Sequence, residues 1–416
     1  MTFSCEEHAF RANRFPPYVL GTIAEKVMQA RIEGIDVVDL SQMNPSTKLP
    51  ARALDKLIQA TLLPHNHRYS SSQGIAKLRW SVVSWYDRRF GVALDADREV
   101  VVTMGIKEGI GHMLMALLIE GDTAIVLTPS YPIHAASVLL AGGNIIEVPF
   151  LLGADLADGA KGKPLVMSGD SDAFFASLAS AFEKTWPRPK FILLNFPHNP
   201  TGTVATVEFF ERLVDFAVRN SLYVIHDFAY ADICFDGYKA PSIMQVKGAS
   251  EVAVEFYSLS KGYGLTGWRV GFCVGNCELV GALKKVKSYL DFGIFQPLQI
   301  AAIEVLKEET DRHVAEVVSE YGHRRDVLVD NLNSIGWEVT RPLGSTFVWA
   351  PIPTKWATEA GSRSFSERLL SDARVAVCPG VGFSAASDNF VRFALVASED
   401  RIRRAVSEIG RVFGGK

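Results

Sequence analysis

Short apolar segments alternate with amphipathic helical segments between about residues 95 and 275. Nearly continuous apolar strands that alternate with helices are typical of a parallel sheet covered on both faces. The pattern therefore predicts an α/β fold with a mostly parallel sheet flanked by helices. The strand-like segments are REVVVTMG (98–105), DTAIVLTPS (122–130), NIIEVPF (144–150), KFILLNF (190–196), SLYVIHDFAY (221–230) and VAVEFYSLS (252–260), and the first two helical ones are IKEGIGHMLMALLIEG (106–121) and YPIHAASVLLAGG (131–143).

The pattern changes after about residue 300. Long charged helices are predicted at 313–336 and 398–413, and four apolar segments between them are predicted as antiparallel strands. These segments are WEVTRPLG (337–344), STFVWAPIP (345–353), RVAVCPG (374–380) and FVRFALV (390–396). We expect a large domain of residues 50–300 and a smaller α+β domain of residues 1–49 and 301–416.

Composition narrows the class of protein. The chain has 416 residues, and 48% of them are apolar, which is enough for a large core. Its 43 basic and 46 acidic residues give a formal net charge of −3 without a long basic run, so we expect no nucleic-acid partner. The N-terminal MTFSCEEHAFRANRF lacks the apolar core of a signal peptide, and no apolar run approaches membrane-spanning length. We expect a cytoplasmic protein with no membrane partner and no metal.

The motif GYGLTG at 262–267 has the glycine spacing of a dinucleotide-binding loop. Such a loop must open a helix whose N-terminal N–H groups face a pyrophosphate. The segment that follows, WRVGFCVG at 268–275, is instead predicted as a buried strand. The chemistry of this region therefore falls to the two cations that flank the glycines, Lys261 and Arg269, unless both are loop cations in surface salt bridges.

Polar and charged side chains follow the predicted strands directly. Ligands on parallel sheets bind at the carboxyl ends of the strands, so these residues should converge on one crevice. They are Gly105, Ile106, Lys107, Tyr131, Asn199, Asp227, Tyr230, Ser258, Ser260 and Lys261, with Arg269 at the start of the next strand. An amine, a carboxylate, an amide, two phenols and several phosphate-type donors form a set that suits pyridoxal 5'-phosphate.

Five of these residues would contact the cofactor ring. Lys261 would bond to it covalently, and a lowered pKa would let the amine also move a proton. Asp227 would face the pyridinium nitrogen and keep the ring electron-withdrawing. Asn199 and Tyr230 would hydrogen-bond the phenolic oxygen of the ring, and Tyr131 would stack on its face. We take Lys261, Asp227 and Tyr230 as candidate catalytic residues.

The cofactor phosphate would lie at the start of the helix that follows the first strand. There the backbone N–H groups of Gly105, Ile106 and Lys107 would point at it. The other donors of this cradle would be Ser258, Ser260 and Arg269. Singly, each residue of the whole set also has an ordinary explanation as a helix cap, a turn residue or a loop side chain. Their order at successive strand ends favours a common site.

Four motifs, in order and spacing, resemble those of the fold-type I pyridoxal-phosphate aminotransferases of class I/II: NFPHNPTGT (195–203), HDFAYADI (226–233), SLSKGYGLTGWRVGF (258–272) and FVRFALV (390–396). The resemblance covers nearly the whole chain and implies the roles given above. It further implies that Arg392 binds the α-carboxylate of the substrate beside Asn199, a bidentate contact that suits a guanidinium. It also implies a homodimer with shared active sites, in which Tyr69 of HRYSSSQG reaches the phosphate of the partner subunit.

Within this family the chain resembles bacterial alanine aminotransferases that work with glutamate and pyruvate, through RFPPYVL, YDRRFGV, SYPIH and APSIMQV. The resemblance implies a ping-pong transfer of the amino group of an L-amino acid, with an alanine-like donor favoured, to a 2-oxo acid such as 2-oxoglutarate. Three positions depart from the family pattern. Met43 replaces a usual glycine beside the substrate carboxylate, Ile106 a small phosphate-binding residue, and Gly264 an asparagine. We count Met43 among the substrate-binding residues and expect it to reshape the pocket.

Two alternatives stay open at this point. A pyridoxal-phosphate-dependent oxidase or lyase of secondary metabolism could use the same scaffold, and an oxidase would release ammonia and peroxide without an acceptor 2-oxo acid. A regulator with an aminotransferase-like sensor domain would normally need an added DNA-binding module, and we expect no room for one before the first family motif.

Overall fold

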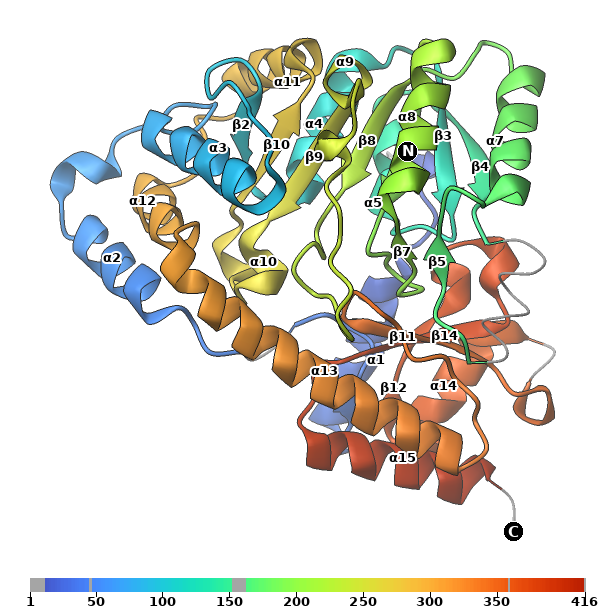
Figure 1. Cartoon of the computed structure of the whole chain (residues 1–416). Coiled ribbons are helices and arrows are strands. Elements are labelled where there is room, and N and C mark those ends of the chain that lie inside the picture. The colour runs from blue at the N-terminus through green and yellow to red at the C-terminus, as the bar shows by residue number, and fades with distance from the viewer. Residues whose placement is uncertain (1–11, 45–46, 152–161, 358–359, 415–416) are drawn as a thin grey trace, which may run out of the picture.

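The computed structural model describes residues 12–44, 47–151, 162–357 and 360–414 (Figure 1). A seven-stranded sheet forms its centre, in the order β2-β10-β9-β8-β6-β3-β4. Neighbouring strands are parallel except at β10, which runs antiparallel to β2 and β9. This sheet confirms the predicted α/β fold. Its strands are β2 (Val100–Thr103), β3 (Thr123–Thr128), β4 (Asn144–Pro149), β6 (Phe191–Asn195), β8 (Tyr223–Asp227), β9 (Ala253–Ser258) and β10 (Gly271–Gly275).

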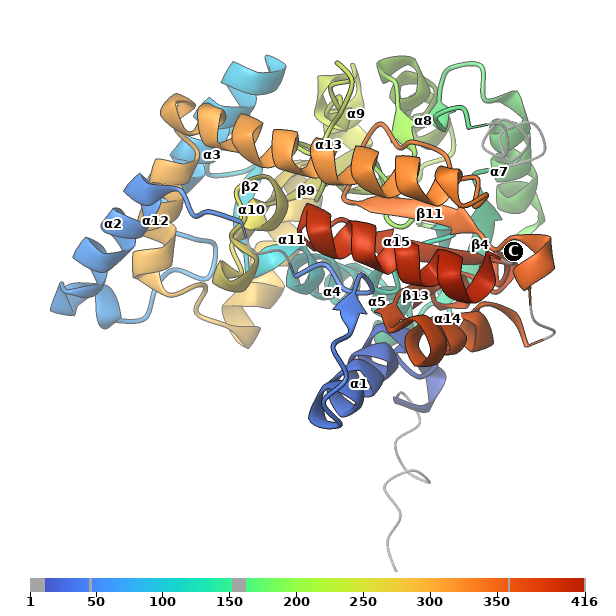
Figure 2. The ribbon, with the colours of Figure 1, turned by 90° about the horizontal axis from the view of Figure 1, so that it is seen from below.

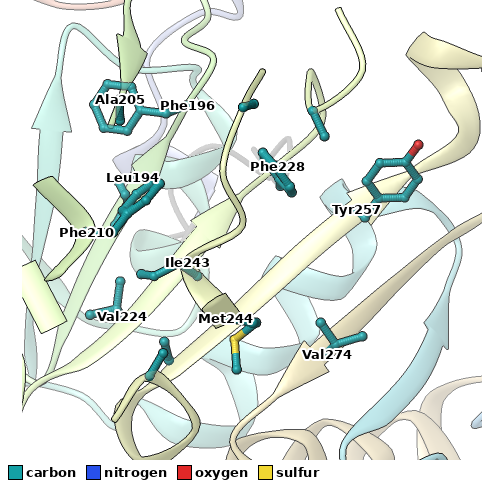
Figure 3. Packing of buried hydrophobic residues seen from close by; sticks show 14 of the residues in the cluster. Leu194, Phe196, Ala205, Phe210, Val224, Phe228, Ile243, Met244, Tyr257 and Val274 are labelled. Atoms are coloured by element: carbon teal, nitrogen blue, oxygen red, sulfur yellow. The ribbon is translucent and has the colours of Figure 1, made fainter. Parts of the chain in front are cut away.

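The two faces of the sheet are buried in separate hydrophobic cores, because successive side chains of a strand point to opposite faces. Val100 and Val102 lie in the larger core, part of which Figure 3 shows, whereas Val101 lies in the other. Helices α3 (Ala76–Phe90), α7 (Asp172–Lys184) and α8 (Val207–Arg219) cover the first face. Helices α4 (Gly105–Leu117), α5 (Ile133–Leu140) and α11 (Cys277–Leu290) cover the second.

The C-terminal part of the chain has its own sheet and core. The antiparallel strands are β11 (Phe347–Pro351), β14 (Phe390–Ala394) and β13 (Cys378–Pro379), and the helices are α13 (Asp311–Ser334), α14 (Gly361–Ala373) and α15 (Glu399–Phe413). Figure 2 shows α13 and α15 side by side. The N-terminal segment joins this part, because β1 (Val38–Asp39) pairs in parallel with β12 (Val375–Ala376). The domain boundaries at residues 50 and 300 remain a proposal.

The remaining elements complete the framework around the sheet. They are α1 (Val19–Ile32), α2 (Ala51–Thr61), α9 (Ala249–Val252), α10 (Leu259–Gly262) and α12 (Gln296–Val305), with β5 (Val166–Met167) paired to β7 (Val204–Ala205). Helix α2 packs against α12 at one end of the molecule (Figure 1). No helix within the described ranges combines the length and the apolar character needed to span a bilayer.

The predicted strand at 337–344 is wrong. Within this segment the structure forms a single β-bridge, between Gly344 and Cys234. Pro342 lacks an N–H group for a strand ladder, and the N–H of Val339 donates to the side chain of Asn333 instead. The apolar pattern had correctly indicated burial, but a neighbouring side chain, rather than another strand, satisfies the backbone here.

Candidate active site

A cavity of about 520 Å³ opens at the carboxyl ends of β6, β8 and β9 and reaches the C-terminal part of the chain. It brings together most of the residues predicted from the sequence. Those that line it are Met43, Ile106, Lys107, Tyr131, Asn199, Asp227, Tyr230, Ser258, Ser260, Lys261, Arg269 and Arg392. Gly105 lies behind the lining, and Tyr69 lies elsewhere on the surface.

Lys261 lies in the short helix α10, which directly follows the buried strand β9. Its Nζ is 5.9 Å from the centre of the Tyr230 ring. Burial, followed by the positive charges of Arg392 and Arg269, lowers the pKa of Lys261 from 10.5 to about 8. The negative charge of Asp227 raises this pKa, but burial and the two arginines outweigh it. An amine with such a pKa can act as a nucleophile and a proton acceptor close to neutral pH.

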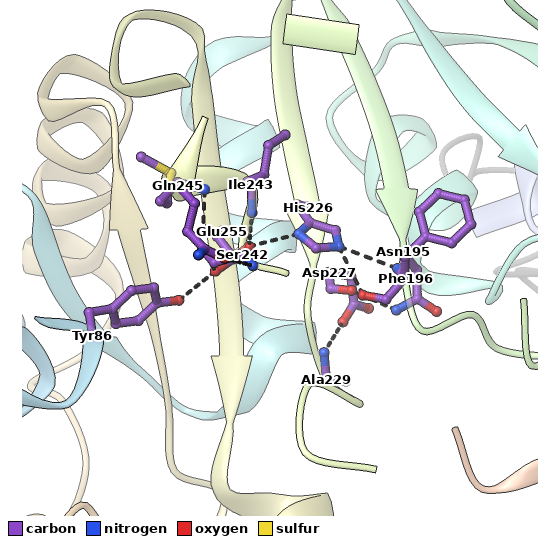
Figure 4. Close-up of polar contacts among 11 residues, drawn as sticks. Tyr86, Asn195, Phe196, His226, Asp227, Ala229, Ser242, Ile243, Gln245 and Glu255 are labelled. Carbon is purple, nitrogen blue, oxygen red and sulfur yellow. Dashed lines mark hydrogen bonds and ion pairs between the residues drawn. The ribbon is translucent and has the colours of Figure 1, made fainter. Parts of the chain in front are cut away.

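Asp227 is the last residue of β8, and hydrogen bonds fix the direction of its carboxylate. Oδ2 lies 3.0 Å from Nε2 of His134, which donates to it, and Oδ1 accepts from the N–H of Ala229 at 3.1 Å. The backbone carbonyl of Asp227 accepts from the side chain of Asn195 at 2.6 Å (Figure 4). Residue Asp227 is 5% exposed, and it lines the cavity.

Asn195 and His134 are two polar residues of the site that the sequence reasoning missed. The side-chain oxygen of Asn195 accepts from the N–H of Asn199 at 2.8 Å, so this amide connects the backbones of Asp227 and Asn199. The strand-end rule could have found Asn195, which ends β6. For His134 the signal is weaker, because only its place in SYPIH next to Tyr131 points to the site.

Arg392 enters the cavity from β14 and is 2% exposed. Its Nη1 donates to Oδ1 of Asn199 and its Nη2 to the carbonyl of Ser41, both at 2.8 Å. The guanidinium carbon lies 4.0 Å from the centre of the Phe347 ring. The buried Nε has no hydrogen-bond partner among the described residues.

The opposite end of the cavity has the features of a phosphate site. The first N–H groups of α4, which starts at Gly105, have no partner within the helix. Gly105 has a φ of +71°, and a Cβ at this position would lie 2.4 Å from Nη2 of Arg269. The glycine therefore makes room for the guanidinium beside the helix start. The two hydroxyls at this end are those of Ser258 and Ser260, 2.9 Å apart. This donor set fits the phosphate of a cofactor.

The structure gives a physical reason for two of the three unusual positions. The side chain of Ile106 belongs to the core under α4, so this residue offers the cavity its backbone rather than a polar group. Gly264 has a φ of +69°, and a Cβ there would lie 2.1 Å from Oγ1 of Thr47, so a larger residue would require Thr47 to move. Met43 is half-buried between the cavity and the C-terminal core.

Two phenols and an ammonium group line the mouth of the cavity. Nζ of Lys107 lies 5.1 Å from the centre of the Tyr18 ring and 5.8 Å from that of Tyr131. Burial, followed by the neighbouring Tyr18, raises the pKa of Tyr131, and burial also raises the pKa of Tyr230. The phenols of Tyr131 and Tyr230 therefore stay protonated and can donate hydrogen bonds. Tyr18, in RFPPYVL, was not predicted as a site residue.

Tyr69 lies outside the cavity, and its residue is 84% exposed. Its ring contacts that of Phe292, with 4.5 Å between the centres. Within a single chain this phenol is therefore not part of the site.

Comparison with known proteins agrees with this geometry. The family "Aminotransferase class I and II" matches residues 35–409. The chain is 44% identical to the glutamate-pyruvate aminotransferase AlaC of Escherichia coli strain K12, over 98% of this chain and 94% of that protein. It is 37% identical to an LL-diaminopimelate aminotransferase of Moorella thermoacetica, over 98% of this chain and 99% of that protein. A substrate-bound structure of BacF from Bacillus subtilis matches with a TM-score of 0.87 and 27% identity over the full length of both chains.

The chain therefore belongs to the class I and II aminotransferases. It is an enzyme that depends on pyridoxal 5'-phosphate. The phosphate cradle, the amine and the oriented carboxylate described above fit this cofactor.

The lowered pKa of Lys261 can be measured in cofactor-free protein. We expect labelling of this lysine by an amine reagent, followed by mass spectrometry of its peptide, to rise with pH around a midpoint near 8. Because the unfolded chain holds this proton up to about pH 10.5, the free energy of unfolding should gain from Lys261 as the pH rises from about 8 to 10.5. Lys261→Met should remove that gain. A labelling midpoint near 10.5 would contradict the assignment.

Proposed function

We propose that the protein transfers the amino group of an alanine-like L-amino acid to a 2-oxo acid such as 2-oxoglutarate, in the two half-reactions of a ping-pong mechanism. The observation that carries the proposal is that the Lys261 amine, the oriented carboxylate of Asp227 and the guanidinium of Arg392 face one cavity. The similarity to a glutamate-pyruvate aminotransferase supports the alanine-like donor. LL-diaminopimelate, named for other relatives, is the competing donor.

Each residue at the reacting end has one task. Pyridoxal phosphate supplies an electron sink for the electron pair left at the substrate Cα. Lys261 holds the cofactor covalently and, once free, takes the proton from Cα. Asp227, oriented by His134, places its negative charge at the ring nitrogen. Tyr230 and Asn199 would hold the ring oxygen, and Tyr131 would lie against the ring face. The backbone of 105–107 would bind the phosphate together with Ser258, Ser260 and Arg269.

The substrate end selects for a compact L-amino acid. Arg392 binds the α-carboxylate through its fork, and the unpartnered Nε adds a donor that otherwise stays unsatisfied in a buried position. Asn199 already contacts this guanidinium and keeps its plane fixed. Met43 occupies space that a glycine would leave open, which favours a small side chain on the substrate.

Lys107 supports a dicarboxylic acceptor. Its ammonium lines the mouth of the cavity between two aromatic rings, and none of the described carboxylates forms an ion pair with it. Arg392 and Lys107 therefore offer cationic groups at two separate points of one cavity. A 2-oxo acid with a second carboxylate, such as 2-oxoglutarate, matches both.

We also propose that two chains form a homodimer with shared active sites. Two exposed apolar side chains, Phe292 and Phe295, line one surface hollow together with Tyr69, and Tyr289 and Leu290 at the end of α11 are exposed as well. Large exposed apolar patches mark interaction surfaces. In the dimer, Tyr69 of the partner subunit would donate to the cofactor phosphate. The cytoplasmic location remains a prediction from the sequence.

A half-reaction screen tests the reaction and its donor. Purified protein should be yellow, and its absorbance band should shift on addition of L-alanine, with smaller shifts for bulky amino acids. Lys261→Ala should bind the cofactor phosphate but lose turnover by at least roughly 10³-fold, because the other amine that lines the cavity, Lys107, lies at its mouth between Tyr18 and Tyr131. A Lys261→Ala variant that transaminates at the wild-type rate would falsify the assignment. Release of ammonia and peroxide without an acceptor would indicate the oxidase alternative instead.

The acceptor subsite is tested by Lys107→Met. We expect the KM for 2-oxoglutarate and glutamate to rise roughly 10- to 100-fold, since a charged hydrogen bond contributes about 1.5–3 kcal/mol. The KM for pyruvate and alanine, which have a single carboxylate, should change less than about threefold. These two substrates therefore serve as the control within the same variant. An equal rise for pyruvate and 2-oxoglutarate would assign Lys107 to cofactor binding alone.

The shared site is tested by mixing two impaired variants, Lys261→Ala and Tyr69→Ala. In a mixed dimer, one site carries both lesions and the other carries neither. Activity should therefore appear on mixing and subunit exchange, up to about half of the wild-type value per mixed dimer. Absence of such recovery, with mixed dimers verified by mass spectrometry, would place Tyr69 outside the partner's site.

A further inference from the structure

A buried carboxylate outside the cavity, Asp232, connects two segments that carry site residues. It follows Asp227 and Tyr230 in the segment after β8, and its side chain is 1% exposed. One of its oxygens accepts from the guanidinium of Arg89 on α3, and the other accepts from the hydroxyl of Tyr257 on β9. Asp232 does not line the cavity and is unused in the proposed chemistry.

The donors around Asp232 are fixed in their protonated forms. Burial lowers the pKa of Arg89, but the negative charge and hydrogen bond of Asp232, together with the neighbouring Tyr257 and Tyr263, outweigh this effect and raise that pKa. Burial, followed by Asp232, raises the pKa of Tyr257 well above its usual value. Arg89 also lies 4.7 Å from the centre of the Trp85 ring, and Trp85 donates to the hydroxyl of Tyr263 at 3.2 Å. Two residues of α3 therefore contact the region around Lys261: Arg89 through its ion pair with Asp232, and Trp85 through its hydrogen bond to Tyr263.

Helix α10, which carries Lys261, lies directly on the Asp232 carboxylate. A Cβ added to Gly262 would lie 2.2 Å from Oδ2 of Asp232, 2.6 Å from its Cγ and 2.7 Å from its Cβ. Such distances are shorter than any van der Waals contact, so only a glycine permits this approach. The carboxylate thus sets how closely α10 can approach the segment that bears Asp227 and Tyr230.

We infer that Asp232 is a positioning residue for Lys261: held by Arg89 and Tyr257, its carboxylate fixes α10 and thereby the distance of the Lys261 amine from Asp227 and Tyr230. The inference rests on the proposed role of Lys261. Small displacements of a reacting group are costly, since about 1 Å can reduce a rate by roughly 10²-fold. A carboxylate that only stabilised the fold would not affect the titration of Lys261.

The first test compares Asp232→Asn with Asp236→Asn. Asp236 makes a matched control, because its carboxylate also pairs with a buried arginine, Arg325, at 2.7 and 3.0 Å, and lies in the same segment without contact to α10. Its φ of +56° is one that asparagine tolerates. In cofactor-free protein, Asp232→Asn should move the labelling midpoint of Lys261 upward from about 8 toward 10.5, whereas Asp236→Asn should leave it unchanged.

In the loaded enzyme, Asp232→Asn should lower kcat roughly 10- to 100-fold and change the KM of the amino donor less than about threefold. Asp236→Asn should keep both constants within about twofold and, because its side chain is 49% exposed, should lose less of its resistance to urea. The proposal is overturned if Asp232→Asn loses stability as the control does but keeps the wild-type labelling midpoint and kcat.

A second pair of variants keeps the test decisive if Asp232→Asn does not fold. Gly262→Ala should displace α10 from the carboxylate and reproduce both the shifted midpoint and the lower kcat. Gly281→Ala is its control, because nothing lies within 4 Å of that helical position in α11. A wild-type midpoint and kcat in Gly262→Ala would reject the inference. The labelling readout needs no substrate, so failure here is distinct from failure of the proposed reaction, which Lys261→Ala tests separately.

Discussion

The register of β8 between β6 and β9 is the constraint on which the site depends. Asn195, Asp227 and Phe256 lie side by side across these three strands, and this alignment lets the Asn195 amide reach the backbone of Asp227. A slip of one residue would turn Asp227 to the other face of the sheet and put His226 in its place. The fully buried contact between Nδ1 of His226 and Oε2 of Glu255, 2.8 Å apart, opposes such a slip, because either polar group without its partner would be costly (Figure 4).

The sequence predicts much of this arrangement for a topological reason. Strands buried on both faces have a clear apolar pattern, and parallel connections bring their carboxyl ends to one edge, so Asp227 and Lys261 are placed together by counting strands. His134 is different, because its contact with Asp227 depends on how α5 lies against the sheet, which no local pattern encodes. The strand prediction for 337–344 is wrong for a related reason. The spacing of apolar residues indicates which residues are buried but not which group satisfies the backbone hydrogen bonds.

The departures from the family pattern are compensated locally rather than at the reacting groups. At Gly264, the side chain of Thr47 occupies the space that a Cβ would take. Ile106 gives its side chain to the core under α4 and leaves phosphate binding to the backbone and to Arg269. Met43 has no such partner in the phosphate end and acts where substrates differ. Changes of this kind alter specificity while the groups at the ring stay the same.

Among the described residues that line the cavity, four cations, Lys107, Lys261, Arg269 and Arg392, face a single carboxylate, Asp227. This excess of positive charge is part of what lowers the pKa of Lys261. A phosphate beside Arg269 and a substrate carboxylate on Arg392 would offset those charges and move the pKa of the amine back upward. The two arginines would thus couple the binding of anions to the basicity of the amine. With a pKa of about 8, part of the Lys261 amine is already neutral slightly above neutral pH and can act as a nucleophile, and a higher pKa with both anions bound would make it a stronger proton acceptor.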